Sequence, residues 1–529
     1  MAESSAEVHG APIADLDQTL WNVLSTSAAK FPERTALISM WQRAGACDSA
    51  ANSNPPEGSQ CVRWTFADLH QRATILANDL TTLGCQPGMH MAAIFWNSAE
   101  WALFFWAAAK VGMVYVPIDS RGGDDTRYIL ATLNPQVLVV QNTDVARLLD
   151  IGDGQQGVPE VLIDCSGNSK QHESWMGFDG ENLKDCRGVH IDKVVAGLAA
   201  CMDHQDMEGT DDVALTIFTS GTTGKPKGCV HTNRNLLAQT FDYDPNPPEH
   251  VDKWVVHTPV SHIFAINNAL RAWRTGSSAV FPSKSFDVAA TVRALVQEQC
   301  TVISATPTLV RALLAHKDFP RPDDLNLSMI TIGGTGISDE DICLCLQGLG
   351  ADHAIQAYGM SEGAPLVSWK RCDPLLADGY HPGVGKALPG ARVRICAPGT
   401  RAMLRHGEIG ELHVGGPSVI SGYFAGADDS SFYVDETGPW LVSGDQGKID
   451  EDGIVYLFGR YKDLIIRGGE NIHPARIESA LAELAGVQVG ARHCPFVKEV
   501  WADNAFTESS RRHLGRPRRP AHRRSCHTP

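Results

Sequence analysis

Apolar residues along the first part of the chain follow two alternating patterns. TLWNVLSTSAAKF (19–31) has helical spacing that ends near Pro32, and TALISM (35–40) is typical of a strand. Strands alternating with helices predict a parallel β-sheet covered by helices. The helical segments that continue the series are FADLHQRATILANDLTTLG (66–84), AEWALFFWAAAKVG (99–112) and DTRYILATL (125–133), and the strand segments are HMAAIFW (90–96), VYVPID (114–119) and QVLVVQ (136–141).

Two polar stretches interrupt this alternation. Residues 45–60, rich in Ser, Asn and Pro, are typical of a surface loop, and a second polar stretch covers 167–185. The alternation then resumes, which predicts more helix-covered sheet. Its strand segments are VVHTPV (255–260), SAVFP (278–282), TVISATP (301–307) and MITIGGT (329–335), and its helical segments are VAATVRALVQEQ (288–299) and LVRALLAHK (309–317).

The pattern changes after Pro389. The segments that follow are short, alternating and punctuated by glycine, which favours antiparallel hairpins. They are RVRICAP (392–398), GEIGELHVGG (407–416), PWLVSGDQGKIDEDGIVYLFGR (439–460) and KDLIIRGG (462–469). NIHPARIESALAELAG (471–486) then starts a new helix, so we expect a domain boundary between Arg460 and Asp463.

Composition and charge narrow the class of protein. A chain of 529 residues is too long for one ordinary hydrophobic core, so we expect two or more domains. A net charge of −16 argues against a nucleic-acid surface, which needs basic side chains to neutralise phosphates. Residues 1–18 lack the pattern of a secretory signal, and WALFFWAAA (101–109) is too short to span a bilayer. The 14 cysteines show neither zinc nor disulfide spacing. We therefore expect a soluble, reduced, cytoplasmic protein.

The segment TSGTTGKPKG (219–228) combines hydroxyls, glycines and two lysines. It differs from the P-loop, because only two residues separate Gly221 from Gly224 where the P-loop has four. Glycines let a backbone approach a ligand closely, and N–H, O–H and ammonium donors can surround a polyphosphate. The segment therefore predicts a phosphate-binding loop, with a flexible surface loop as the alternative.

Five further motifs follow in order, and with this loop they resemble the adenylate-forming superfamily of acyl-CoA synthetases, luciferases and non-ribosomal-peptide adenylation domains. The motifs are PVSHIFA (259–265), GGTGIS (333–338), YGMSE (358–362), SGDQGKIDEDG (443–453) and GRYKDLIIRGGENIHPARIE (459–478). The resemblance covers about residues 20–478 and implies that a carboxylate attacks the α-phosphate of ATP. Such a catalyst must neutralise charge and hold two anions in position.

The resemblance implies a role for each matching residue. Thr219–Gly228 would hold the β- and γ-phosphates, with Lys227 as a charged contact and Thr223 near the metal, and Glu362 would ligate Mg²⁺. Asp445 and Arg460 would hold the ribose. The nucleotide- and CoA-binding candidates are Thr219, Ser220, Gly221, Thr222, Gly224, Lys225, Gly228, Gly333, Gly334, Thr335, Tyr358, Gly359, Met360, Ser361, Asp445, Arg460, Lys462, Gly468, Gly469 and Glu470; the catalytic candidates are Thr223, Lys227, Glu362 and His262.

Five of these residues have specific further roles in the resemblance, and three have simpler alternatives. Tyr358 with Gly333 and Gly334 would enclose adenine, His262 would line the acyl pocket, and Lys462 would be the hinge before the RGGEN loop on the path of the pantetheine thiol. Alternatively, Glu362 starts a helix, Asp445 forms a turn, and His262 is a core residue.

The expected fold class is α/β. A large N-terminal domain of helix-covered β-sheets carries a small β-barrel-like portion, and a hinge joins it to an incomplete small α+β C-terminal domain. By residue number, 1–18 are a flexible lead-in, 19–461 the large AMP-binding domain with 389–461 as its antiparallel portion, 462–488 the start of the small domain, and 489–529 a disordered or out-of-frame tail.

The segment after the hinge departs from the family. The family normally carries a lysine near its C-terminus that contacts the carboxylate and the α-phosphate, but Lys498 is the only lysine after Lys462 and has no matching context. The tail from Glu508 is rich in Arg, Pro and His. Two interpretations remain: a reading frame lost between Gly486 and Ala505, which this composition favours, or a naturally shortened protein with a basic tail.

We therefore expect an ATP- and Mg²⁺-dependent ligase that activates a carboxylic acid as an acyl-adenylate and passes the acyl group to CoA. RGGENIHPARIE resembles fatty and medium-chain acyl-CoA synthetases more than peptide synthetases, and SHIFAINNALRAW (261–273) has no acidic residue to bind an amino-acid ammonium group. Two alternatives remain, a ligase that loads the pantetheine thiol of a carrier protein and a nucleotide-binding protein with impaired adenylation.

Overall fold

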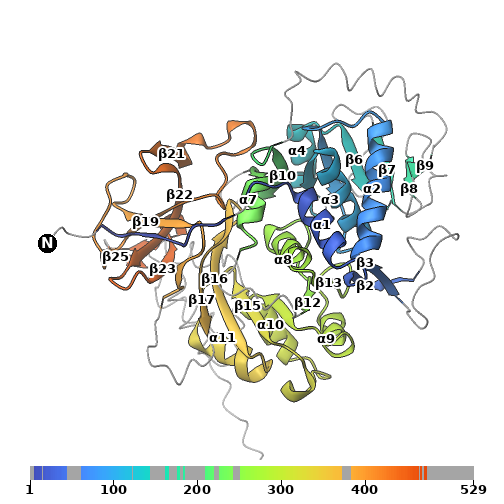
Figure 1. Cartoon of the computed structure of the whole chain (residues 1–529). Coiled ribbons are helices and arrows are strands. Elements are labelled where there is room, and N and C mark those ends of the chain that lie inside the picture. The colour runs from blue at the N-terminus through green and yellow to red at the C-terminus, as the bar shows by residue number, and fades with distance from the viewer. Residues whose placement is uncertain are drawn as a thin grey trace, which may run out of the picture. The chain divides into compact units, whose positions relative to one another are not determined.

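Two compact units make up the chain. The computed structural model describes residues 5–14, 16–44, 61–121, 123–142, 161–165, 176–178, 183–184, 209–219, 225–241, 251–371, 383–463, 465–467 and 470–472. The first unit comprises Met1–Ser443 and Gly447–Leu457, and the second comprises Gly444–Gln446 and Phe458–Pro529. Two β-sheets and three helical layers alternate within the first unit (Figure 1).

The first sheet has eight strands in the order β11-β10-β5-β4-β6-β7-β8-β9. They are β4 (His90–Ile94), β5 (Val114–Pro117), β6 (Val137–Val140), β7 (Val161–Asp164), β8 (Met176–Phe178), β9 (Leu183–Lys184), β10 (Val213–Thr219) and β11 (Lys227–Thr232). The strands from β10 to β8 are parallel, whereas β11 and β9 pair antiparallel at the two edges.

The second sheet has nine strands in the order β18-β17-β16-β15-β14-β12-β13-β2-β3. They are β2 (Thr35–Arg43), β3 (Cys61–Thr65), β12 (Lys253–Val255), β13 (Ser278–Phe281), β14 (Val302–Ala305), β15 (Met329–Gly333), β16 (His353–Met360), β17 (Gly363–Arg371) and β18 (Lys386–Ala387). The strands from β16 to β2 are parallel, and β17, β18 and β3 are antiparallel to their neighbours.

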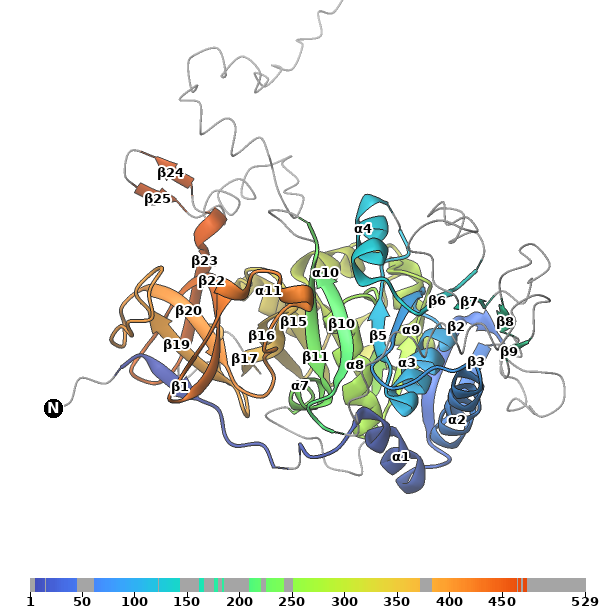
Figure 2. The same ribbon diagram turned by 90° about the horizontal axis from the view of Figure 1, so that it is seen from above.

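Helices cover both faces of each sheet (Figure 2). The helices are α1 (Leu20–Lys30), α2 (Phe66–Thr82), α3 (Ala99–Val111), α4 (Asp124–Leu133), α7 (Asn233–Ala238), α8 (Ile263–Arg274), α9 (Val288–Gln297), α10 (Pro307–Leu314), α11 (Asp339–Cys343) and a π-helical turn at Leu344–Gly348. Because successive strand residues face opposite sides, Met91 and Ala93 of β4 pack with α1, α2, α3 and α8 between the sheets, while Ala92 and Ile94 pack under α4. Helices α9, α10 and α11 cover the outer face of the second sheet.

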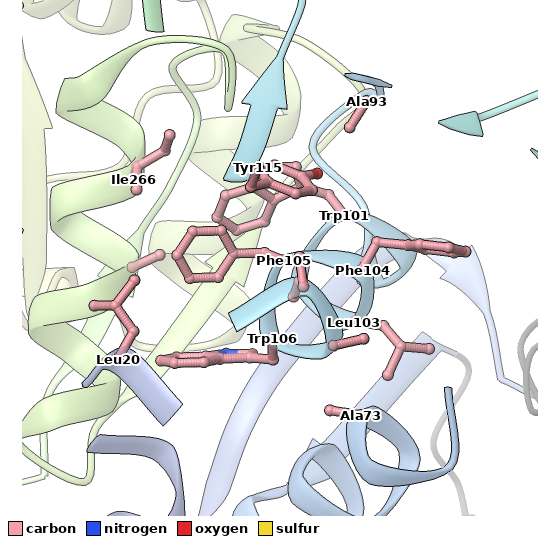
Figure 3. Packing of buried hydrophobic residues seen from close by; sticks show 14 of the residues in the cluster. Leu20, Ala73, Ala93, Trp101, Leu103, Phe104, Phe105, Trp106, Tyr115 and Ile266 are labelled. Carbon is pink, nitrogen blue, oxygen red and sulfur yellow. The ribbon is translucent and has the colours of Figure 1, made fainter. Parts of the chain in front are cut away.

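Helix α3 is the centre of the core between the sheets. Its first ten residues are all buried, as expected for a helix that is apolar on every side. Ser98 caps its first turn through Trp101 N, and Gly112 ends it at φ 83°, a left-handed conformation that favours glycine. Trp101 and Trp106 both pack on Trp273 of α8, at ring-centroid distances of 6.0 and 5.3 Å. The side chains of Trp101, Phe105 and Trp106 belong to this buried cluster (Figure 3).

A third, antiparallel sheet has the order β1-β19-β20-β22-β21, with β23 paired to β22. Its strands are β1 (Glu7–His9), β19 (Arg392–Cys396), β20 (Gly410–Gly415), β21 (Phe432–Asp435), β22 (Gly438–Ile449) and β23 (Val455–Arg460). In the second unit, β24 (Ile465–Arg467) and β25 (Glu470–Ile472) form a hairpin after a 3₁₀ turn at Tyr461–Asp463.

Three expectations differ from the structure. The sheets are parallel only in their interiors, because hairpins add antiparallel strands at their edges. Glu7–His9 lie in the expected flexible lead-in, but they form β1, because Val8 joins the apolar cluster of the third sheet and Glu7 pairs with Arg394. The strand expected at 255–260 occupies Lys253–Val255. Beyond Val255, Asn97 Nδ2 donates hydrogen bonds to the carbonyl oxygens of Val256 and Thr258, so these oxygens are bonded to a side chain and not to a neighbouring strand.

Several expectations lie outside the described residues. They are the loop at 45–60, most of the polar stretch at 167–185, the helix at 471–486 and the tail from 489. Among the described residues, no helix combines the length and the apolar character needed to cross a membrane.

Candidate active site

The predicted phosphate loop is the connection of the β10–β11 hairpin. Thr219 and Lys227 pair across the two strands, and Thr219 Oγ1 donates to Lys227 O at 3.4 Å. Ser220, Gly221, Thr222, Thr223 and Gly224 lie outside the described residues. Lys227 and Gly228 therefore belong to a strand and not to the loop.

Gly228 is close to the chain's own side chains. A Cβ at this position would lie 2.9 Å from Phe424 Cβ and 3.0 Å from Thr216 Cγ2. Any larger residue would push β11 away from Phe424. The need for glycine here is thus explained by packing, whereas the sequence suggested close approach of a ligand.

Both lysines of the motif lie over aromatic rings. Lys225 Nζ is 4.9 Å from the ring centre of Tyr128 in α4, and Lys227 Nζ is 5.2 Å from that of Tyr423. Lys227 also forms an ion pair and hydrogen bond with Asp428. The hydrogen bond from Lys227 lowers the pKa of Asp428, so its carboxylate stays ionised.

Glu362 lies in the tight turn between β16 and β17, where Met360 pairs with Gly363. The alternative that Glu362 starts a helix is therefore wrong, because both neighbouring elements are strands. Tyr423 Oη donates to Glu362 Oε1 at 2.7 Å, and Ile420 N donates to Glu362 O at 2.9 Å. Burial, and then the neighbouring Glu362 carboxylate, raise the pKa of Tyr423, which keeps its hydroxyl a donor.

Three buried polar side chains hold the Glu362 turn from behind, and we call them the His231 network: His231, Gln239 and Asn267. His231 Nε2 lies 2.8 Å from Ser361 O, and Asn267 Nδ2 donates to Ala364 O at 2.7 Å. Gln239 Nε2 lies 3.3 Å from His231 Nδ1, and Gln239 Oε1 accepts from Asn267 at 3.0 Å. Burial lowers the pKa of His231 to about 4, so the ring is neutral and Nε2 is the donor.

The adenine candidates lie at neighbouring strand ends. Gly333 ends β15 and pairs with Ala357 of the parallel strand β16, which continues through Tyr358, Gly359 and Met360. A Cβ at Gly333 would meet Ala357 O at 2.7 Å, and Gly334 has φ 82°. Thr335 follows and is exposed. Carboxyl ends of parallel strands are the usual ligand position in α/β sheets.

His262 precedes the first residue of α8 and is exposed, so it is not a core residue. It lies close enough to Asp119 to affect that carboxyl. Burial opposes ionisation of Asp119, but hydrogen bonds from Arg121 and the nearby His262 lower its pKa overall. The acyl-pocket role of His262 stays a prediction.

The remaining candidates belong to the second unit. Arg460 Nε donates to Asp445 Oδ1 at 3.1 Å; Asp445 is buried and Arg460 half exposed. Asp445 is thus more than a turn former, since its carboxylate orients a guanidinium. Lys462 lies exposed in the 3₁₀ turn, and Glu470 begins β25 opposite Arg467. Gly468 and Gly469 lie outside the described residues.

The chemistry of Glu362 fits a magnesium ion. Mg²⁺ is usually held by one or two carboxylates together with substrate phosphates. Among the described residues Glu362 has no Lys, Arg or His ion-pair partner, and its Oε1 is oriented by the neutral hydroxyl of Tyr423. The second candidate ligand, Thr223, lies outside the described residues.

The sequence did not point to Tyr423 or Asp428. They lie in SGYFAGADDS (421–430), which has the glycine and serine content of an ordinary turn. Asp428 is 201 residues from Lys227, and Tyr423 is 61 from Glu362. The aromatic pair Tyr423-Phe424, followed closely by Asp428, is the feature of this segment that could have drawn attention to it.

Comparison with known proteins gives the family. The profile of the AMP-binding enzyme family matches residues 24–424. Acyl-CoA ligase SID4 of Ajellomyces capsulatus is 29% identical over 499 residues, which cover 90% of this chain and 78% of that protein. Feruloyl-CoA synthase of Amycolatopsis sp is 30% identical over 437 residues, 81% of this chain and 79% of that protein. ATP-bound MatB from Rhodopseudomonas palustris has a TM-score of 0.66 at 24% identity, covering 89% of this chain and 84% of its own, and confirms the expected α/β fold.

Proposed function

The chain belongs to the AMP-binding enzyme family, and we propose that it joins a small carboxylic acid to CoA with ATP as the energy source. Relatives named as acyl-CoA ligase and feruloyl-CoA synthase support this reaction class. We assign the ATP phosphates to the β10–β11 hairpin because Lys227 and Glu362 both contact Tyr423. Lys227 Nζ lies over the Tyr423 ring, and Tyr423 Oη donates a hydrogen bond to Glu362. A cation and a carboxylate so placed suit a magnesium–phosphate complex.

The first half-reaction brings two anions together. A carboxylate oxygen of the acid forms a bond to the α-phosphorus of ATP, the bond from that phosphorus to the bridging oxygen breaks, and pyrophosphate leaves. Lys227 would bind phosphate oxygens, and Glu362 would hold Mg²⁺, which would supply positive charge to neutralise the charge that develops on the leaving group. Tyr423 orients the Glu362 carboxylate, and the His231 network fixes the backbone of its turn.

The second half-reaction transfers the acyl group. The sulfur of CoA bonds to the acyl carbon, the bond between that carbon and the AMP oxygen breaks, and the thiol proton goes to solvent. In our proposal Asp445 and Arg460 hold the ribose, Lys462 is the hinge residue, and the segment around Glu470 lies on the path of the thiol.

The proposed acid is a fatty or medium-chain acid or a related carboxylic acid without an amino group. The first turn of α8, which begins beside His262, carries no acidic residue. A substrate ammonium group would therefore lack a carboxylate partner there, which favours an uncharged chain beside the carboxylate.

The test is product formation from a panel of acids. The purified chain is incubated with Mg·ATP, CoA and straight-chain, aromatic and amino acids, and acyl-CoA and AMP are quantified by mass spectrometry. We expect equal amounts of acyl-CoA and AMP for an acid without an ammonium group. Glu362→Gln should slow the formation of both by about 100- to 1,000-fold, whereas the control Glu436→Gln, at an exposed position, should not. Release of ADP instead of AMP would contradict the proposal.

A further inference from the structure

We propose that Asp428 is an internal anion that competes with the phosphates of ATP for Lys227 and so weakens nucleotide binding. This inference depends on the proposed function, because it takes Lys227 to be a phosphate contact. It adds a residue that opposes binding to the residues that promote it.

The contact itself has the geometry of a displaceable pair. Lys227 and Asp428 form a hydrogen-bonded ion pair whose side chains remain 35% and 30% exposed. Their charges therefore meet at a surface that a solute can reach. A carboxylate at hydrogen-bond distance from an ammonium group occupies one of the positions that a phosphate oxygen would take.

Large aromatic side chains hold the segment around Asp428 on both sides, Tyr423 and Phe424 before it and Phe432 after it. Tyr423 is 9% exposed and packs on Phe432 at a ring-centroid distance of 5.3 Å, and Phe424 packs near Phe218 at 6.3 Å. Asp428 follows four residues after Phe424, between two 3₁₀ turns. Tyr423 can thus keep its hydrogen bond to Glu362 while Asp428 moves away.

Backbone strain also makes this segment easy to rearrange. Ala425 and Asp428 have φ values of 55° and 58°, in the left-handed region that favours glycine. Each such residue costs free energy unless the surroundings compensate for it. The ion pair with Lys227 is one such compensation, so exchanging Asp428 for phosphate releases the strained turn.

Asp428 has a second hydrogen-bond partner, Ser430, which can stay bonded to its carboxylate after the ion pair with Lys227 breaks. Ser430 Oγ donates to Asp428 Oδ1 at 3.0 Å, and Ser431 N donates to Asp428 O at 3.0 Å. The exchange therefore leaves neither Lys227 nor Asp428 without a hydrogen-bond partner. An unpaired charge would make the exchange costly.

The test compares nucleotide affinities by isothermal titration calorimetry in the full-length chain. Mg·ATP, Mg·ADP, AMP and adenosine are titrated into the wild type, Asp428→Asn, Asp428→Ser and the control Asp324→Asn, which removes an exposed acid paired with Arg321. We expect both Asp428 variants to bind Mg·ATP about two- to fivefold more tightly, the fold-change that corresponds to one partly exposed ion pair. AMP and adenosine should bind with unchanged affinity, as should all four ligands to the control.

A double variant separates this inference from the proposed function. In the Lys227→Ala background, Asp428→Asn should give no gain in Mg·ATP affinity, because the lysine for which Asp428 and the phosphates compete is absent. Unchanged or weaker Mg·ATP binding by both Asp428 variants, with the wild type still binding Mg·ATP, would overturn the competition alone. Equal tightening of adenosine would overturn it as well. A wild type that binds no nucleotide would overturn the proposed function together with it.

Discussion

The core around α3 and the surroundings of the Glu362 turn are both buried, but different interactions hold them. Trp101, Phe105 and Trp106 pack on their neighbours and on Trp273 through ring faces and edges. In the part of the chain that the structure describes, the indole nitrogens of Trp101 and Trp106 have no hydrogen-bond partner. The His231 network instead holds the Glu362 turn through directed hydrogen bonds to Ser361 O and Ala364 O.

Because of this difference, we expect the α3 core to determine the stability of the fold and the hydrogen bonds at the Glu362 turn to determine the reaction rate. Apolar contacts are non-directional and roughly proportional to area, so the α3 core fixes the two sheets without fixing any single atom. Hydrogen bonds to Ser361 O and Ala364 O fix the backbone on both sides of Glu362. We therefore expect core variants to change the free energy of unfolding, and site variants to change the reaction at nearly constant stability.

The largest expected effect is on the core. Trp106→Ala should lower the free energy of unfolding by about 3–5 kcal/mol, the usual cost of removing a buried large aromatic side chain. Chemical denaturation measures it. Trp106→Phe is the matched variant: it keeps a ring and removes the unpaired indole N–H, so it should cost clearly less. Equal losses for Ala and Phe would show that ring packing is not what stabilises this core.

The next effect is on chemistry. Glu362→Gln should reduce the rate of adenylate formation by about 100- to 1,000-fold, the range for removing one preorganised electrostatic partner, with the melting temperature close to that of the wild type. Gln keeps the acceptor for Tyr423 Oη but not the charge. Single-turnover kinetics with Mg·ATP measure the rate. A large drop in melting temperature together with the rate would make Glu362 a structural residue and weaken the comparison.

A smaller effect is expected at the lysine. Lys227→Ala should weaken Mg·ATP binding by about 1.5–3 kcal/mol, the value of a charge-assisted hydrogen bond. Part of this loss should be masked, since the wild type must break the Lys227–Asp428 ion pair to bind phosphate, whereas the variant has no such pair to break. Calorimetry with the control Lys317→Ala, at an exposed position, measures it. Equal affinities for wild type and Lys227→Ala would place the phosphates elsewhere.

The smallest effect is a pH dependence of stability. Burial lowers the pKa of His231, His257 and His413 to about 4, below the roughly 6.5 of an unfolded histidine. Between these values the unfolded chain binds more protons, so stability is complete above about pH 6.5 and falls as the pH drops toward 4. His231→Gln should reduce this slope by at most about 1.4 kcal/mol per pH unit. Denaturation at several pH values tests it; an unchanged slope would mean that His231 does not titrate on unfolding.

More of the hydrophobic core than of the candidate active site could be predicted from the sequence. The unbroken apolar run at 101–109 in α3 predicts a buried helix from local pattern alone, and the alternation of segments predicts the parallel interior of both sheets. The antiparallel pairing of β11 with β10 and of β17 with β16 could not be predicted, because a short apolar run does not show whether its strand turns back in a hairpin or crosses over to a parallel position. Motif order brought Gly333, Tyr358 and Glu362 into one hypothesis. Tyr423 and Asp428 lack such a motif, and only the folded chain shows that they contact Glu362 and Lys227.

The most direct test of the account is pyrophosphate exchange into ATP without CoA. The wild type, given Mg·ATP, labelled pyrophosphate and an acid selected from the product panel, should return label to ATP only when the acid is present, because the exchange requires reversible formation of an acyl-adenylate. Glu362→Gln should lose the exchange while staying folded, and Glu436→Gln should keep it. Exchange that is independent of the acid, or that persists undiminished in Glu362→Gln, would contradict the assignment of adenylate formation to the site between the β10–β11 hairpin and the Glu362 turn.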